Sequence, residues 1–223
     1  MGAPMTVELL RVAVYRRFAE TGQAATVPGL AEQFGVAEDS VRAGLRELAA
    51  GRSLVLDDLD RIVMAHPFSS VPLGFAVMGS DTLWWGGCAW DSFALPHLIP
   101  AQSPVLVATR CPACGRALAW NVGTDQAPAG AEVAHFLVPA ARMWDDVVHT
   151  CAHQRLFCSP GCVDQWLDAT GNTKGYVMDL STLWRFASDW YTGRLDPGYQ
   201  RREPSQAADY MRSAGLEGPF WGL

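Results

Sequence analysis

The sequence lacks an excess of basic residues: 17 lysines and arginines stand against 23 aspartates and glutamates, for a net charge of −6. Because contacts to nucleic-acid phosphates need a basic face, this balance argues against a general nucleic-acid-binding protein. Charged residues are also scarce, at 18% of the chain, whereas hydrophobic residues make up 49%. This composition is typical of a globular protein with a sizeable core and excludes a disordered chain.

Targeting signals are absent as well. The first residues contain no basic segment followed by an apolar stretch, so the sequence predicts no secretory signal. No apolar run reaches the roughly 18 residues that a membrane-spanning helix needs, and no internal repeat or low-complexity segment occurs. We therefore expect a cytoplasmic protein without a membrane partner, built as one large domain or two small ones.

The N-terminal part has the pattern of a winged-helix domain, in which helices are followed by a β-hairpin. Apolar spacing predicts helices over 7–21, 26–34 and 39–50, and a hairpin over 53–66. Asp39 or Ser40 is expected to cap the third helix. That helix carries Arg42 and Arg46 for a DNA-binding role, but acidic residues accompany them. The acidic balance favours a structural domain over DNA binding.

The composition changes near residue 70, beyond which all six cysteines and all nine tryptophans lie. We therefore predict an α+β protein with a winged-helix-like domain over 1–70 and a mixed α/β catalytic domain over 71–223. In the second domain we expect strands near 73–78, 105–110, 117–122 and 132–138, and helices near 88–98, 140–148, 159–169, 180–194 and 205–214.

The first cysteine group is Cys88 with Asp91. Glycines precede Cys88 and a helical pattern follows it, so its thiol would meet the positive end of the helix dipole, which lowers a thiol pKa. Asp91 would lie on the same face of the turn, where its carboxyl group can exchange a proton with the thiol or with a ligand. The alternative is a buried cysteine followed by a helix-capping aspartate.

The second group consists of two spaced pairs. Their members are Cys111, Cys114, Cys158 and Cys162. The C-x₂-C-G segment is typical of a turn whose backbone amides point at the sulfurs, and a second pair completes four thiolates. The spacing predicts a tetrahedral structural zinc site. The alternative is a set of buried or redox-active cysteines without metal.

The remaining cysteine, Cys151, completes a pattern that resembles the alkylmercury lyase (organomercurial lyase) family. The family's hallmark segment is matched by GCAWDSFALPHLI at residues 87–99. Cys111 matches the family's next cysteine. The family segment V-x-x-x-C-x-H-x-x-x-F-x-S is matched from Val147 to Ser159, with Cys151 in register. The resemblance covers residues 81 to about 190, with a winged-helix-like region in the expected place before it.

The chain also departs from the family pattern. A glycine, Gly87, stands where an aromatic residue often precedes the first catalytic cysteine, and Trp90 replaces a common leucine. The set Cys114, Cys158 and Cys162 is additional. These departures suggest a divergent branch with a metal-bound cysteine cluster.

The resemblance implies a mechanism in which Cys88, Asp91 and Cys151 are catalytic. Mercury is soft and prefers two thiolates, so Cys88 and Cys151 would bind it while Asp91 first takes a thiol proton and then protonates the leaving carbon. The substrate would be a small organomercurial, Hg(II) the bound product, and cellular thiols or a mercuric reductase its acceptor. No organic cofactor is implied. Trp84, Trp85 and Trp90 are expected to line a pocket for the organic group, the alternative for each being ordinary core packing.

Three other functions fit parts of the pattern. A metal-sensing regulator would combine a DNA-binding winged helix with sensing cysteines, but its recognition helix is usually basic. A non-catalytic zinc protein would use only the two cysteine pairs. A lyase of the same fold could act on another organometallic or small-molecule substrate.

Overall fold

The computed structural model describes residues 4–223. The N-terminal helices are α1 (Val7–Thr21), α2 (Val27–Phe34) and α3 (Glu38–Ala50). The strands are β1 (Val55–Leu56), β2 (Ile62–Ala65), β3 (Phe68–Ser69), β4 (Phe75–Met78), β5 (Leu83–Gly86), β6 (Val105–Arg110), β7 (Ala117–Val122), β8 (Val133–Phe136), β9 (Gln154–Phe157) and β10 (Tyr176–Asp179). The later helices are α4 (Ala89–Leu98), α5 (Val147–Ala152), α6 (Pro160–Thr170), α7 (Leu180–Ser188) and α8 (Pro204–Ser213), with short 3₁₀ turns at Pro100–Gln102, Ala140–Arg142 and Pro219–Trp221.

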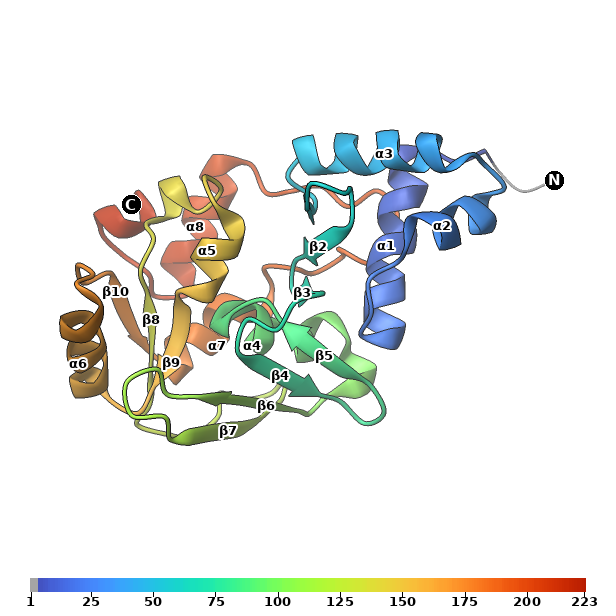
Figure 1. Cartoon of the computed structure of the whole chain (residues 1–223). Coiled ribbons are helices and arrows are strands. Elements are labelled where there is room, and N and C mark those ends of the chain that lie inside the picture. The colour runs from blue at the N-terminus through green and yellow to red at the C-terminus, as the bar shows by residue number, and fades with distance from the viewer. Residues whose placement is uncertain (1–3) are drawn as a thin grey trace.

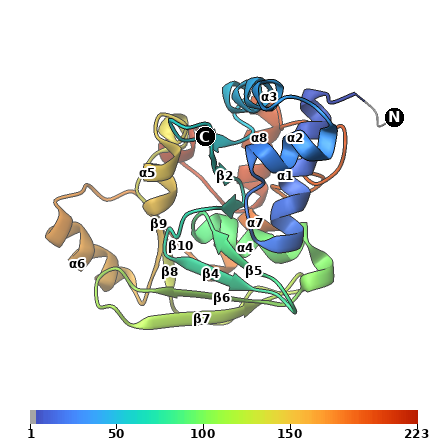
Figure 2. The same cartoon turned by 45° about the vertical axis from the view of Figure 1, so that its right-hand side comes forward.

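The strands form two antiparallel sheets. One contains seven strands in the order β1-β2-β3-β5-β4-β6-β7, and the other contains three in the order β10-β8-β9. Both views place helices α1–α3 at the opposite end of the molecule from α6 and the three-stranded sheet, with α4 and α7 between these ends (Figure 1 and Figure 2). The expected α+β class is therefore confirmed.

Helix α4 is the central element of the fold. All residues from Ala89 to Pro96 are buried, because α4 packs against β4, β5, β6, β9 and α7. A helix that is buried all round needs an apolar sequence on every face, which the segment AWDSFALP provides apart from two polar residues. Those two, Asp91 and Ser92, are held by hydrogen bonds: Tyr191 donates to Asp91, and Ser92 donates to the Cys88 carbonyl.

The N-terminal helices and hairpin follow the predicted order. Helix α3 begins at Glu38, and its N-cap is Ala37 without any side-chain capping bond, so the prediction of Asp39 or Ser40 as the cap is wrong. Both residues lie in the first helical turn. The β1–β2 hairpin continues through β3 into the seven-stranded sheet. The domain boundary near residue 70 stays a prediction.

Several C-terminal elements differ from the predicted ones. The helix expected at 140–148 is instead a 3₁₀ turn followed by α5, because Asp146 caps a new helix start by accepting from the His149 amide. Helix α7 ends at Ser188, six residues earlier than predicted. Sequence patterns did not predict the short strands β5, β9 and β10. Strand β5 forms a hairpin with β4 directly before it, whereas β9 and β10 pair with β8 across longer stretches of the chain. In the described part of the chain, no helix combines the length and apolar character that a membrane span requires.

Candidate active site

Cys88 occupies the N-cap of α4, directly after strand β5. Its Sγ accepts a hydrogen bond from the Asp91 amide at 3.3 Å, as a serine or aspartate oxygen does at other helix starts. The Cys88 side chain is 1% exposed. Cys88 is thus the capping residue, and Asp91 stands three residues inside the helix with its carboxyl group free for other partners.

Helix α5 brings Cys151 to the same point from the other side of the sequence. The Cys151 thiol lies 4.0 Å from Asp91 Oδ2 and contacts the Cys88 sulfur, so two thiols and a carboxyl group meet in a buried cluster. The three residues that the sequence singled out as catalytic are therefore neighbours in the fold.

The two thiols differ in acidity. Burial raises the pKa of Cys88 well above its usual value, and its hydrogen bond to Cys151 and the nearby Asp91 charge add to this effect. The hydrogen bond from Cys88 lowers the pKa of Cys151 in spite of burial, with help from His66. The expectation that the helix terminus lowers the pKa of Cys88 is wrong, because burial outweighs the single amide. Cys151 is the thiol that ionises first.

His66 and Tyr191 complete the polar contacts of the cluster. His66 Nε2 lies 3.4 Å from Cys151 Sγ, and the Tyr191 hydroxyl donates to Asp91 Oδ1 at 2.5 Å. Burial would lower the pKa of His66, but the charges of Asp91 and Cys151 raise it. Burial raises the pKa of Tyr191 well above its usual value, so the phenol remains a neutral donor. His66, Asp91 and Cys151 could together hold a metal ion, since their ligand atoms lie within 4.8 Å of one another.

Arg194 contacts two residues of this cluster, His66 and Tyr191. Its guanidinium donates to the His66 carbonyl at 2.9 Å and lies over the Tyr191 ring at 4.8 Å. Sequence reasoning missed His66, Tyr191 and Arg194. Each is a single polar residue without a spaced partner, and only the folded chain brings it to the thiols.

Gly87 explains one departure from the family pattern. A Cβ at this position would stand 2.3 Å from Asp91 Oδ2 and 2.7 Å from the Met64 side chain. The neighbouring Gly86 is similarly confined, since its Cβ would meet Ser92 Oγ at 2.1 Å. A larger residue before Cys88 would therefore displace the carboxyl group, so the glycine keeps Asp91 beside the thiols.

A cavity of about 280 Å³ opens onto the cluster. Its wall includes Cys88, Asp91, Cys151 and His66, together with apolar side chains from three regions of the chain. The larger apolar residues are Trp90, Met143, Trp144, Trp190, Met211 and Trp221. Of the three tryptophans expected here, only Trp90 lines the cavity. Trp84 instead donates to the Phe18 carbonyl of α1 at 2.9 Å, and Trp85 is partly exposed on β5.

The second cysteine group also comes together. The sulfurs of Cys111, Cys114, Cys158 and Cys162 all lie within 4.8 Å of one another. Burial alone would raise the pKa of Cys111, but amides of Cys114, Cys158 and Ala113 donate to its sulfur and lower the pKa to about 7. Burial and hydrogen bonds to its neighbours raise the pKa of Cys158 to about 12. In the described residues every cysteine is a free thiol.

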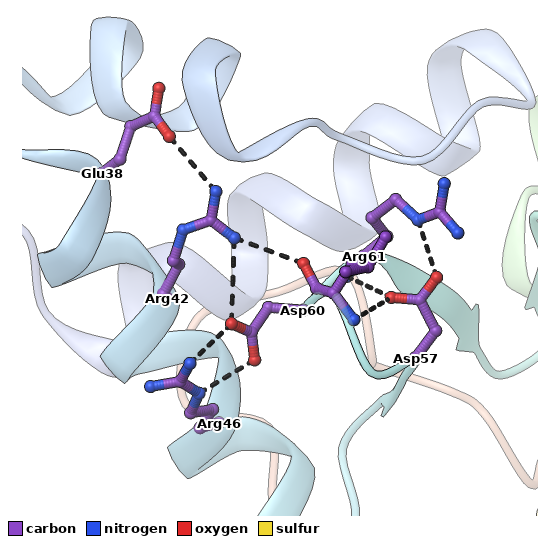
Figure 3. Close-up of polar contacts among 7 residues, drawn as sticks. Glu38, Arg42, Arg46, Asp57, Asp60 and Arg61 are labelled. Atoms are coloured by element: carbon purple, nitrogen blue, oxygen red, sulfur yellow. Dashed lines mark hydrogen bonds and ion pairs between the residues drawn. The ribbon is translucent and has the colours of Figure 1, made fainter.

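The two arginines of helix α3 form ion pairs with carboxylates of the N-terminal part. Arg46 donates two hydrogen bonds to the Asp60 carboxylate, at 2.6 and 2.8 Å, and Arg42 forms ion pairs with both Glu38 and Asp60 (Figure 3). Arg61 of the following hairpin pairs with Asp57 in the same view. The helix that would face DNA thus offers arginines whose charge is already balanced by carboxylates.

Two thiols of unequal acidity beside a carboxyl group, at the end of an apolar cavity, define a site suited to a soft metal that carries an organic group. A model of the alkylmercury lyase family, MerB, matches residues 68–192, more than half of the 223 residues. The chain therefore belongs to the alkylmercury lyase family and is a carbon–mercury lyase.

A solved structure extends this similarity over most of the fold. The crystal structure of the mercury-bound form of MerB2 matches with a TM-score of 0.63 and 19% sequence identity, covering 85% of this chain and 97% of that chain. No curated protein matches the sequence.

Proposed function

We propose that this protein cleaves the carbon–mercury bond of small organomercurials by protonolysis, which yields a hydrocarbon and Hg(II). The observation that carries the proposal is the buried meeting of Cys88, Asp91 and Cys151 at one cavity. Two of these residues lie at the start of α4 and the third on α5, 60 positions after Asp91. The match to the alkylmercury lyase family supports the reaction class.

Cys151 takes the substrate first. Its lowered pKa favours the thiolate, which is the form that binds mercury. An organomercurial arrives as R–Hg–SR′, the adduct of a small thiol. Cys151 displaces R′S⁻, which leaves with a proton from solvent, and a sulfur–mercury bond replaces the earlier one.

Cys88 and Asp91 then complete the reaction. The Cys88 thiol passes its proton to Asp91, and the resulting thiolate adds to mercury. This second sulfur raises the electron density on the metal and directs negative charge onto carbon. Asp91 returns the proton to that carbon, the electron pair of the carbon–mercury bond becomes the carbon–hydrogen bond, and R–H leaves. Hg(II) remains on the two sulfurs. No oxidation or reduction occurs.

The cavity supplies the surroundings for the organic group. Apolar side chains such as Trp90, Met143 and Trp144 exclude water from the reacting bond, which strengthens the electrostatic interactions of Asp91. A volume of about 280 Å³ accommodates a methyl or phenyl group beside the mercury atom. By contrast, a hollow of about 760 Å³ near residues 100–129 has no cysteine in its wall and offers mercury no soft ligand.

The product requires an acceptor. Hg(II) held by two thiolates leaves by exchange with a thiol pair, so we propose cellular thiols or a mercuric reductase as its acceptor in the cytoplasm. The free state of the six cysteines agrees with a reducing compartment. The overall role would be the detoxification of organomercurials.

The direct test uses purified protein with methylmercury or phenylmercury and an excess of small thiol. We expect methane or benzene in amounts that grow with enzyme concentration and exceed the amount of enzyme. Headspace gas chromatography measures both products. Organomercurial binding without hydrocarbon above the thiol-only blank would contradict the proposal.

His66 is expected to stabilise the Cys151 thiolate through its 3.4 Å contact. His66→Leu removes the donor and should slow transfer of the organomercurial to Cys151 by roughly tenfold, the value of one hydrogen bond to a charged group. His66→Gln retains an N–H donor and should recover most of the rate. Stopped-flow measurement of mercurial transfer checks both variants.

The matched control is His153→Asn, at the C-terminal end of α5 and outside the cavity. It should transfer the organomercurial at the wild-type rate. Equal rates for His66→Leu and His153→Asn would remove His66 from the mechanism.

We further propose that residues 1–70 form a winged-helix-like domain with a structural role and that 71–223 form the catalytic domain. The helix order and the β1–β2 hairpin support the first assignment for the described residues. Trp84 of β5 donates to the Phe18 and Ala19 carbonyls of α1, so the helices pack directly against the sheet that leads to Cys88. The paired state of Arg42 and Arg46 argues against DNA binding.

A further inference from the structure

The four-cysteine cluster lies where two parts of the fold meet, apart from the cavity. Cys111 and Cys114 belong to the turn between β6 and β7 of the seven-stranded sheet. Cys158 directly follows β9 of the three-stranded sheet, and Cys162 lies in the first turn of α6. Both views show the β6–β7 turn beside the start of α6 (Figure 1 and Figure 2). None of these cysteines lines the catalytic cavity.

The spacing of the sulfurs suits one tetrahedral metal ion. A zinc ion with Zn–S bonds of about 2.3 Å separates its sulfurs by about 3.8 Å. In this structure the Cys114 and Cys158 sulfurs lie 3.5 Å apart, and all four lie within 4.8 Å of one another. Disulfide bonds join sulfurs in pairs at about 2.05 Å, whereas these four form one compact group of free thiols.

The backbone around Cys111 is shaped to present sulfurs to a cation. The Gly115 amide donates to the Cys111 carbonyl, and the Cys111 amide donates to the Arg116 carbonyl, each at 2.9 Å. Gly115 has a φ of +73°, which closes the turn. This folding directs the amides of Ala113 and Cys114 at the Cys111 sulfur. Amides aimed at a sulfur stabilise a thiolate.

The second cysteine pair is held in place by the capped start of helix α6. Ser159 caps α6 by accepting from the Cys162 amide at 3.3 Å, which fixes the first turn of an 11-residue helix. Four thiolates and one zinc ion would carry a net charge of −2. Arg155 lies close enough to act on the Cys111 thiol, and its positive charge offsets part of this charge; Arg116 acts on the Cys158 thiol and also pairs with Glu132 at 3.4 Å.

We propose that Cys111, Cys114, Cys158 and Cys162 bind one structural zinc ion, which fastens the β6–β7 turn to the junction of β9 and α6. The ion thereby joins the seven-stranded sheet to the three-stranded sheet. With all four positions filled by thiolates, the ion has no open site for a substrate and contributes to folding instead. Strand β9 runs from the end of α5, which carries Cys151, to Cys158, so the ion also anchors the far end of this segment.

Metal analysis of the full-length protein as purified tests the proposal directly. We expect about one zinc per chain. After removal of zinc with a chelator under reducing conditions, the thermal midpoint should fall by about 10 °C, and added zinc should restore it. Cobalt(II) bound in place of zinc should give the visible absorption of a tetrahedral tetrathiolate complex. Absence of both zinc and this cobalt spectrum would overturn the proposal.

Matched variants locate the ion. Cys114→Ser, at an exposed position, should lose zinc and the cobalt spectrum, and Cys114→His should recover both because histidine is also a zinc ligand. The double variant Cys88→Ser/Cys151→Ser should retain one zinc per chain. Loss of zinc from the double variant, or disulfides among these four cysteines in the purified protein, would contradict the assignment. None of these readouts depends on organomercurial cleavage, so the two proposals fail separately.

Discussion

Replacing Cys151 or Cys88 with alanine is expected to lower hydrocarbon release from a bound organomercurial by about a thousandfold or more, which corresponds to ~4 kcal/mol of activation free energy. A single thiolate binds mercury but transfers too little electron density to the carbon for protonation. The loss is expected although each side chain is small and its truncation should cost only ~1 kcal/mol of stability. Single-turnover gas chromatography measures the release, and circular dichroism verifies folding.

The two variants should differ in the step they block. Cys88→Ala removes the hydrogen bond that does most to lower the pKa of Cys151, but it keeps the Cys151 thiol beside His66. This variant should still accumulate an organomercury adduct on Cys151, which mass spectrometry of peptides can locate. Cys151→Ala retains only the thiol whose pKa burial raises, so its adduct at this site should form slowly or not at all. Near-wild-type release by either variant, or the reverse pattern of adducts, would sink the assigned roles.

Asp91→Asn is expected to separate binding from cleavage. The amide keeps the shape of the side chain and an acceptor for the Tyr191 hydroxyl, but it has no acidic proton to give to carbon. Cys151 should therefore still capture the organomercurial at the wild-type level, whereas Cys88 has no carboxylate to take its proton and hydrocarbon release falls by roughly a thousandfold. A titration of organomercurial binding and a single-turnover release assay, run on the same sample, measure the two steps.

Tyr191→Phe provides the matched comparison for this variant. It removes the 2.5 Å hydrogen bond to Asp91 but leaves the carboxyl group in place. We expect a loss of about tenfold in release, the scale of one hydrogen bond to a charged group. If Asp91→Asn kept the wild-type release rate, Asp91 would not be the proton carrier. A capping role for Asp91 is already excluded by Cys88 at the N-cap.

The predicted bounds of helices and strands agree best with the structure where local sequence patterns are strong. Strands β6 and β7 have the predicted bounds, and α4 begins one residue after the predicted start. Periodicity and turn residues within a short stretch determine such segments. The short strands β5, β9 and β10 escaped prediction, because a four-residue strand carries little periodic signal of its own and is stabilised by the strands that it pairs with. The break before α5 came from a local cap at Asp146 that the apolar pattern did not reveal.

The sequence by itself determined the kind of chemistry. Cysteine spacing and the segments around Cys88 and Cys151 carry the family resemblance, and both are local properties of the amino-acid sequence. Only the tertiary structure decided which thiol is the more acidic, because burial and the contacts of Cys151 with Cys88 and His66 arise from segments up to 85 residues apart. It also brought Tyr191 to Asp91, 100 positions away. Electrostatic environment depends on distances in space, and spacing along the chain does not encode those distances.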